Sequence, residues 1–170
     1  TSFELKNSEP VRYYQQIAVE RSLKAISEGK KRMLLTLATG TGKTRTAMDI
    51  IVRLLNENNK LLIMWFANKS ELLQQAYDAF VNLWAHAGKF EVKTKKLWGD
   101  EPGTKIPDSG IVFTGYQKFG NTKLKSKPDY IFVDEAHQIL APTYEAMIDS
   151  LKDLQKQTRV VGLTATPGRG

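Results

Sequence analysis

The chain has 170 residues, the size of one domain, and a chain of this length buries about 70% of its unfolded surface on folding. Its 41% hydrophobic and 25% charged residues exclude the disordered, fibrous and membrane classes. The net charge of +7 fits a polyanionic partner, although most basic clusters are solvated faces. The absence of cysteine, of a signal peptide and of a membrane-spanning apolar run favours a cytoplasmic protein without membrane contact.

Helical and strand patterns alternate along the first third of the chain. Apolar residues at helical spacing predict a helix over Arg12–Glu28 that stops at Gly29. A short apolar run predicts a buried strand over Met33–Ala38. Apolar residues recurring at i, i+3, i+4, i+7 and i+8 then predict an amphipathic helix from about Thr44 to Asn56. The order is therefore strand, glycine-rich loop, helix.

The same order recurs in the middle of the chain. Leu61–Ala67 is a predicted strand, and Ser70 is expected to cap the helix that follows. Val92–Trp98 and Ile111–Tyr116 are further strand candidates. The turn-rich stretch Gly99–Gly110 separates them.

Three more elements complete the predicted domain. Tyr130–Val133 is typical of a buried strand, Pro142–Leu154 of an amphipathic helix and Arg159–Thr166 of a last strand. Strands that alternate with helices favour parallel pairing through right-handed crossovers. The predicted fold is a three-layer α/β/α domain with a parallel sheet.

The motif A-T-G-T-G-K-T, residues 38–44, stands between the first strand and the second helix, as a phosphate-binding loop requires. Gly40 and Gly42 let the backbone N–H groups approach phosphate oxygens, and the helix directs its positive end there. Lys43 adds a charge at the β- and γ-phosphates, and the Thr44 hydroxyl can ligate Mg²⁺. The residues expected to bind the triphosphate are Thr39, Gly40, Thr41, Gly42, Lys43 and Thr44.

This loop predicts ATP and Mg²⁺ as cofactors, with one departure from the strict G-x-x-x-x-G-K-[ST] pattern. Leu37 stands where that pattern has a glycine. A fortuitous glycine-rich turn is the alternative interpretation, and a small-molecule kinase shares the same loop.

An acidic pair ends the predicted strand at Tyr130–Val133. In a parallel sheet the carboxyl ends of strands gather at the edge where the phosphate loop also lies. Asp134 can hold Mg²⁺, and Glu135 can orient and deprotonate the water that attacks the γ-phosphate. His137 is then a coupling residue. A surface acidic pair and a structural histidine are the alternatives.

Two hydroxyls, Thr164 and Thr166, follow in L-T-A-T-P at the last strand. They are expected at the same edge, where they can bond the acidic pair, although threonine is common in strands for propensity reasons alone. His86 is interpreted as structural or solvent-exposed.

The motifs A-T-G-T-G-K-T, D-E-A-H and T-A-T-P, in this order, resemble motifs I, II and III of the superfamily 2 helicases and translocases. Residues 11–16, V-R-Y-Y-Q-Q, are similar to the family's adenine-recognition segment, so Arg12 and Gln15 are expected to contact the nucleotide. Residues 111–119 resemble most closely the motor subunits of type I and type III restriction enzymes. The resemblance implies a RecA-like P-loop NTPase lobe over residues 1–170.

The resemblance also implies a nucleic-acid track, with DNA expected rather than RNA, and contacts to the backbone that read no sequence. The residues it places on that track are Asn68, Lys69, Gln75, Thr114 and Gly115. Residues 67–69 depart from the family's usual segment here.

Members of this family complete their site with a second RecA-like lobe that supplies an arginine finger. We therefore expect residues 1–170 to be a fragment that acts with a second lobe in cis, and with nuclease or modification subunits if the restriction-enzyme resemblance holds. Alone, the chain is expected to bind Mg-nucleotide weakly and to hydrolyse it barely. An RNA helicase or a catalytically silent nucleic-acid-binding module remains the alternative.

Overall fold

The computed structural model describes residues 10–30, 32–38, 42–99, 105–115, 128–135 and 158–166, and for residues 10–15, 37–38 and 165–166 it describes the backbone alone. Three helices and six strands lie within these residues. The helices are α1 (Pro10–Ser27), α2 (Gly42–Glu57) and α3 (Ser70–Ala87). The strands are β1 (Arg32–Ala38), β2 (Leu62–Phe66), β3 (Thr94–Leu97), β4 (Gly110–Thr114), β5 (Tyr130–Val133) and β6 (Arg159–Thr166).

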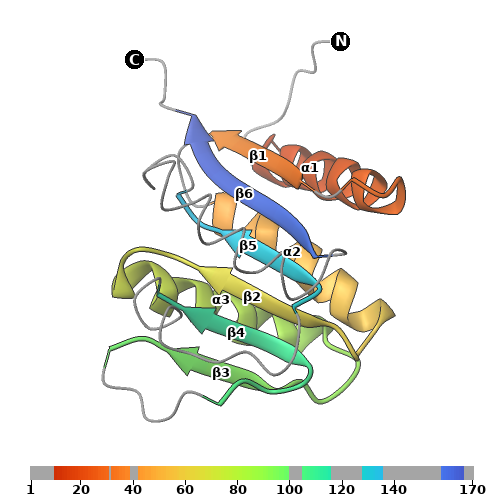
Figure 1. Cartoon of the computed structure of the whole chain (residues 1–170). Helices are drawn as coiled ribbons and strands as arrows, with labels where there is room; N and C mark the ends of the chain where they lie inside the picture. Colours follow the sequence, from red (N-terminus) through yellow and green to blue (C-terminus); the bar gives the residue numbers. More distant parts are fainter. Residues whose placement is uncertain are drawn as a thin grey trace.

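The six strands form one sheet in the order β1-β6-β5-β2-β4-β3, and every neighbouring pair is parallel. The arrows of all six strands accordingly point to the same side in Figure 1. The carboxyl ends of the strands therefore share one edge of the sheet, which is where open α/β sheets bind ligands. The predicted parallel α/β fold is confirmed.

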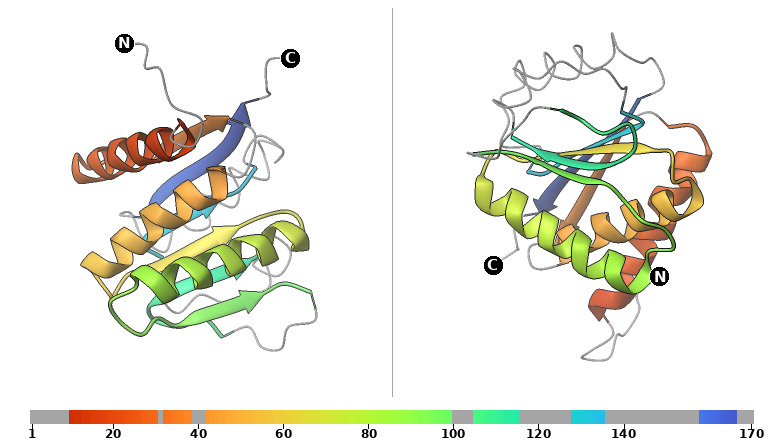
Figure 2. Two further views of the ribbon diagram at one scale, coloured as in Figure 1. Left: turned by 180° about the vertical axis from the view of Figure 1, so that it is seen from behind. Right: turned by 90° about the horizontal axis from the view of Figure 1, so that it is seen from below.

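Helices α1, α2 and α3 lie side by side over one face of the sheet, as the view from behind in Figure 2 shows. Within the described part of the chain no helix is long and apolar enough to cross a membrane. The helix predicted over Pro142–Leu154 lies outside the described residues.

The core lies between this helix layer and the central strands. Every residue of β2, β4 and β5 is buried, which explains their continuous apolar sequences, since a central parallel strand has no solvated face. Trp65 of β2 stacks on Phe132 of β5 with ring centroids 6.1 Å apart. Phe80 of α3 packs against Phe113 of β4 at 6.2 Å. Each such side chain contributes about 1.5–3 kcal/mol through burial.

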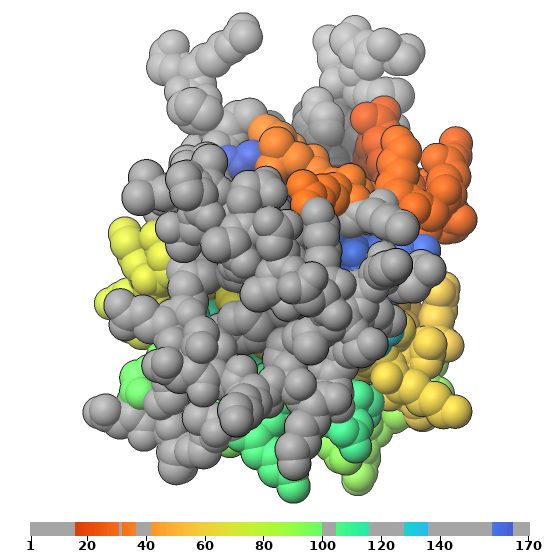
Figure 3. Space-filling model, in the orientation of Figure 1, coloured from red at the N-terminus to blue at the C-terminus, as the bar shows by residue number. Residues whose placement is uncertain are grey.

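The two edge strands differ from this pattern. β1 and β3 lie at opposite ends of the face shown in Figure 3, with β1 in orange and β3 in green. Along β1 exposed residues alternate with half-buried ones, and Leu34 is 66% exposed. The phosphate-loop motif thus follows a strand that is supported on one side, by β6.

The end of α1 has a recognisable stop signal. Gly29 has φ +84°, its N–H donates to Ile26 O at 3.0 Å, and the N–H of Lys30 donates to Ala25 O at 3.2 Å. This pair of bonds is a Schellman motif, which places the left-handed residue one position past the C-cap, here Glu28, and favours glycine there. The stop predicted at Gly29 is confirmed.

The cap predicted at Ser70 is wrong. Ser70 is the first residue of α3, and the N-cap is Lys69, whose backbone is extended and whose side chain makes no capping hydrogen bond. The helix begins one residue earlier than a serine cap would require, so the Ser70 hydroxyl does not hold the position from which an N-cap side chain accepts the N–H of the second or third helical residue. The first turn of α3 therefore begins without a capping hydrogen bond from the side chain of its N-cap residue, Lys69.

Candidate active site

Two segments distant in sequence meet at the carboxyl edge of the sheet. Lys43 is the second residue of α2, and Asp134 and Glu135 follow directly after β5. β6 lies between β1 and β5, so the loop that leaves β1 and the turn that leaves β5 are two strands apart. The connection between β1 and α2, residues 39–41, lies outside the described residues and contains the predicted Thr39, Gly40 and Thr41.

The Lys43 ammonium contacts both carboxylates of the acidic pair. Its Nζ lies 2.7 Å from Asp134 Oδ1 and donates a hydrogen bond to Glu135 Oε1, 92 residues further along the chain. Lys43 is 7% exposed and Asp134 is 2% exposed, so these ion pairs are little screened by water. The structure thus brings together Lys43, Asp134 and Glu135 from the predicted catalytic set.

Backbone geometry fixes the acidic pair. The N–H of Asp134 donates to the carbonyl of Phe66 at 2.8 Å, one position beyond the last register pair of β2 and β5, Phe66 and Val133. Glu135 has φ +52°, a left-handed conformation that non-glycine residues adopt at some energetic cost and that recurs at functional sites. Phe66 is thus a positioning residue that no sequence signal revealed, because its contribution is a backbone carbonyl.

The electrostatics of the cluster are unbalanced. Burial alone would lower the pKa of Lys43, but its contacts with Asp134 and Glu135 outweigh burial and raise that pKa above its ordinary value. Burial raises the pKa of Asp134 above its usual range, and the contact with Lys43 offsets this in part. The two shifts therefore have different causes: contacts with carboxylates raise the pKa of Lys43, and burial raises that of Asp134.

An additional cation fits this arrangement. Asp134 Oδ1 is buried and lies 2.7 Å from the Lys43 ammonium, a charge-assisted contact that Lys43 divides between Asp134 and Glu135. No group of three or more His, Cys, Asp or Glu side chains in the described ranges could hold a metal ion by itself. Mg²⁺ suits such a place, because it commonly binds through one or two carboxylates together with substrate phosphates and water.

The other residues predicted at the nucleotide lie around this cluster or outside the described residues. Thr44 is half-buried in the first turn of α2, beside Gly42 and Lys43. Thr164 is half-buried on β6, and the backbone of Thr166 is the register partner of Ala38, where the phosphate-loop motif begins. His137 lies outside the described residues. Arg12 and Gln15 lie in α1, where their backbone alone is described.

Three of the five residues predicted on the nucleic-acid track lie at the carboxyl edge of the sheet, and two lie within a strand or a helix. Asn68 and Lys69 are exposed directly after β2, and Gly115 follows β4, the neighbouring strand, so these three lie at the carboxyl edge. Thr114 is fully buried, and its hydroxyl donates to Gly115 O at 3.0 Å. Gln75 is exposed on α3, in its second turn.

The histidine interpreted as structural or exposed conforms to both descriptions. His86 is exposed in the last turn of α3, and its Nδ1 lies 2.8 Å from the carbonyl of Asn82. A cationic side chain near a helix C-terminus is favourable to the helix dipole when it is protonated.

Two solved structures share this fold. The UvsW helicase from bacteriophage T4 has a TM-score of 0.65 at 22% identity, over 90% of this chain and 51% of that chain. A nuclease-deletion mutant of the type ISP restriction-modification enzyme LlaGI, in complex with a DNA substrate mimic, has a TM-score of 0.59 at 19% identity, over 99% of this chain and 18% of that chain. The described fold is therefore that of RecA-like helicase domains.

Curated relatives are similar in sequence as well. The type I restriction enzyme EcoAI endonuclease subunit of Escherichia coli is 34% identical over 165 residues, 92% of this chain and 19% of that protein. The ATP-dependent DNA helicase MPH1 of Pyricularia oryzae is 27% identical over 172 residues, 95% of this chain and 15% of that protein. The chain thus spans less than a fifth of the length of these two relatives. A family model described as type III restriction enzyme, res subunit, matches residues 8–169, and the chain belongs to this family.

Proposed function

We propose that this chain is the ATP-binding motor lobe of a superfamily 2 DNA helicase or translocase, in which hydrolysis of Mg-ATP drives movement on nucleic acid. The observation that carries the proposal is the contact of Lys43 with Asp134 and Glu135 at the carboxyl edge of the sheet. Family membership supports it, because the phosphate-loop lysine and the acidic pair are the residues that such a motor uses.

Each side chain of the cluster has a distinct task in this proposal. Lys43 binds the β- and γ-phosphate oxygens with its ammonium, and the N-terminus of α2 adds its positive dipole. Thr44 and Asp134 would hold Mg²⁺, which when bound neutralises charge on the phosphates. Glu135 orients the attacking water and accepts its proton, since its side chain is 18% exposed and thus reaches solvent, unlike that of Asp134 at 2%.

The nucleic acid is proposed to lie along the carboxyl edge beyond the acidic pair. In the strand order β5-β2-β4, the exposed Asn68 and Lys69 come next to the acidic turn, and Gly115 follows. Lys69 supplies a charge for a phosphate, and the backbone of Gly115 supplies polar groups, so these contacts would not select a sequence. The buried Thr114 would act by holding the Gly115 carbonyl. DNA is favoured because MPH1 is a DNA helicase and LlaGI is bound to a DNA substrate mimic.

A restriction-modification context with nuclease or modification partners is favoured because the EcoAI subunit and LlaGI are restriction enzymes. A second RecA-like lobe with an arginine finger is proposed from the superfamily 2 resemblance. A finger of this kind contributes roughly 10³–10⁵ to turnover. Hydrolysis by the 170-residue chain on its own is therefore expected to be slow.

Single-turnover hydrolysis tests the proposed chemistry. With the chain in excess over Mg-ATP, the unmodified protein should release inorganic phosphate slowly. Glu135→Gln should bind ATP but release no inorganic phosphate. Phosphate transfer to an added metabolite instead of water would identify a kinase. Equal rates for the two proteins would contradict the role given to Glu135, and rapid multiple turnover would contradict the need for a second lobe.

A further inference from the structure

The strand at one end of the sheet reaches the same carboxyl edge as the proposed nucleic-acid track. β3 follows β4 in the strand order and lies at the border of the sheet in Figure 1. Its last residue, Leu97, is the register partner of Thr114, and the N–H of Gly115 donates to Leu97 O at 3.2 Å. Trp98 therefore comes beside Gly115, the outermost residue of the proposed track.

A lysine is held at this end of β3 by aromatic rings. The Nζ atom of Lys96 lies 4.2 Å from the centroid of the Tyr77 ring and 5.6 Å from that of the Trp98 ring. Both distances lie within the range of about 6 Å over which the face of a ring attracts a cation. Tyr77 is itself fixed on α3, because its ring packs edge to face on the buried Phe113 at 5.5 Å. The position of the Lys96 ammonium is therefore constrained from the core outward.

These rings hold the ammonium without cancelling its charge. Among the described residues no carboxylate forms an ion pair with Lys96. Asp78, which follows Tyr77 on α3, instead accepts a hydrogen bond from the side chain of Gln74 at 2.9 Å. Lys96 is half-buried and keeps part of its surface in solvent. A positive charge in a fixed place suits an anion, because less side-chain entropy remains to be lost on binding.

A lysine on an edge strand also has a simpler explanation, since charged residues at sheet edges discourage pairing with other chains. Any charge on β3 would meet that need, whether or not aromatic rings hold it in place. The two ring contacts of Lys96 and the position of Trp98 beside Gly115 instead favour a defined ligand at the carboxyl edge.

The spacing of the strands indicates what this ligand contact adds to the track. Neighbouring strands lie about 4.8 Å apart, so β3 is about 10 Å from β2, the strand that leads to Lys69. Successive nucleotides of one strand rise by about 3.4 Å along a duplex. Lys96 would thus meet a different phosphate from the one that Lys69 meets.

We propose that Lys96, held by the rings of Tyr77 and Trp98, binds a backbone phosphate of the nucleic acid and so extends the track onto β3. The inference rests on the proposed function, because it takes the carboxyl edge as the place where nucleic acid lies. Tyr77 and Trp98 are positioning residues in this arrangement, and Lys96 makes the contact. The contact is with phosphate, so it selects no sequence.

Fluorescence anisotropy with a labelled single-stranded DNA oligonucleotide, at several salt concentrations, measures this contact. Lys96→Gln should lower the affinity about threefold, the scale of one exposed charge pair, and should reduce the slope of log K against log salt by about 0.7. Lys96→Arg keeps the charge and should bind as the unmodified chain does. Lys93→Gln is the matched control, because Lys93 is exposed just before β3, at the other end of the strand from Trp98. It also removes one positive charge.

Changes at Tyr77 test whether a ring positions the ammonium. Tyr77→Phe keeps the ring and should leave DNA binding unchanged, whereas Tyr77→Leu should weaken it, because the ammonium is no longer held. In the Lys96→Gln background Tyr77→Leu should give no further loss, since no ammonium is left to position. Thermal unfolding of each variant identifies the chains that are folded. Lys96→Gln, a change at the edge of the sheet, tests the phosphate contact even if Tyr77→Leu does not fold.

The outcomes separate this inference from the proposed function. If Lys69→Ala weakens DNA binding and Lys96→Gln does not, Lys96 only protects the edge of the sheet and the track ends at Gly115. Equal losses with Lys96→Gln and Lys93→Gln would indicate diffuse attraction by the basic strand. A folded Tyr77→Leu chain that binds like the unmodified chain would reject the positioning role of the ring. If neither Lys69→Ala nor Lys96→Gln changes binding, the proposed nucleic-acid track itself is rejected.

Discussion

The backbone N–H of Asp134 donates a hydrogen bond to the carbonyl of Phe66 at 2.8 Å, which extends the ladder between β2 and β5 by one residue past its last register pair. The same β2 leads into Asn68 and Lys69, the residues proposed to meet nucleic acid. One strand therefore borders both the acidic pair and the proposed nucleic-acid track. A shift of β2 would move both together, which is a physical route for coupling between the two sites.

Asp134→Asn should stabilise the nucleotide-free chain by about 1 kcal/mol at neutral pH, because burial disfavours the charge of Asp134 and Lys43 stays paired with Glu135 after the change. Thermal or urea unfolding measures this. Asp49→Asn, which removes an exposed i,i+4 pair, should lower stability by no more than about 0.5 kcal/mol. A destabilised Asp134→Asn chain would show that the carboxylate is well compensated.

The advantage of Asp134→Asn should depend on pH in a defined direction. The pKa of Asp134 is raised in the folded chain above its unfolded value of 3.8. The Asp134 carboxyl therefore binds its proton more tightly in the folded chain than in the unfolded chain. As pH rises from the unfolded pKa of Asp134 to its folded pKa, the unmodified chain loses stability relative to the variant. Unfolding measured from pH 4 to pH 7 should show the two proteins converging at the acid end. A gap that widens toward acid would contradict this assignment.

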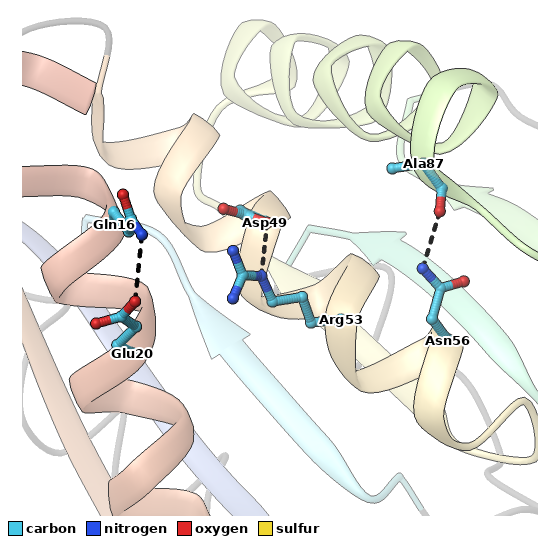
Figure 4. A network of polar contacts seen from close by, with 6 residues as sticks. All are labelled: Gln16, Glu20, Asp49, Arg53, Asn56 and Ala87. Carbon is cyan, nitrogen blue, oxygen red and sulfur yellow. Dashed lines mark hydrogen bonds and ion pairs between the residues drawn. The ribbon is translucent and has the colours of Figure 1, made fainter. Parts of the chain in front are cut away.

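Asn56→Ala should destabilise the chain by about 1–2 kcal/mol, since Asn56 joins the ends of α2 and α3. Its Nδ2 donates to Ala87 O at 2.9 Å, and its Oδ1 accepts from the N–H of Lys89 at 2.9 Å. The contact with Ala87 is drawn in Figure 4, beside the surface pair of Arg53 and Asp49. Arg53→Ala is the control and should change the free energy of unfolding by less than about 0.5 kcal/mol. Equal effects of the two changes would mean that Asn56 makes no special contribution.

Gly110→Ala should be strongly destabilising, by about 3 kcal/mol or more, whereas Gly115→Ala should fold normally. Gly110 has φ +108°, and a Cβ there would lie 2.1 Å from the carbonyl oxygen of Lys93; at Gly115 the nearest atoms would be 3.9 Å away. Left-handed strain and a backbone clash act together at the first position. Circular dichroism during unfolding compares the two variants. A Gly110→Ala chain with unchanged stability would mean that the start of β4 lies differently.

Lys69→Ala should weaken binding to a single-stranded DNA oligonucleotide and reduce the slope of log K against log salt by about 0.7, the value for one phosphate contact on a single strand. Fluorescence anisotropy at several salt concentrations measures the slope. Lys89→Ala is the matched control, because Lys89 is an exposed lysine that follows the C-terminal end of α3, far from the carboxyl edge. Equal losses for the two variants would indicate diffuse attraction by the basic surface.

Buried parallel strands were the most predictable part of the fold. Tyr130–Val133 and Arg159–Thr166 form strands over the predicted residues, because a strand buried between neighbours is an apolar run with polar flanks. The edge strand β3 was predicted over Val92–Trp98 but covers Thr94–Leu97. It pairs with residues 111–114 of β4 alone, so its length is set by its partner and not by its own sequence.

The candidate site was predictable in its parts but not in its contacts. The glycine spacing before Lys43 and the acidic pair after an apolar strand indicated which residues meet, since parallel strands share a carboxyl edge. Two contacts depend on backbone register and burial: the pairing of Lys43 with both carboxylates, and the hydrogen bond from Asp134 to the Phe66 carbonyl. Neither is encoded in a local pattern. The sequence also did not show that Thr114 is buried and that its hydroxyl donates a hydrogen bond to the carbonyl of Gly115.

Calorimetric titration of the chain with Mg-ADP, beside Lys43→Ala and the control Lys89→Ala, tests the central claim most directly. The proposed site predicts saturable binding by the unmodified chain, equal binding by Lys89→Ala, and a loss of at least about tenfold in affinity with Lys43→Ala, because a charge-assisted contact to phosphate contributes about 1.5–3 kcal/mol. Binding by Lys43→Ala at the affinity of the unmodified chain would contradict the claim that Lys43, Asp134 and Glu135 form a nucleotide site.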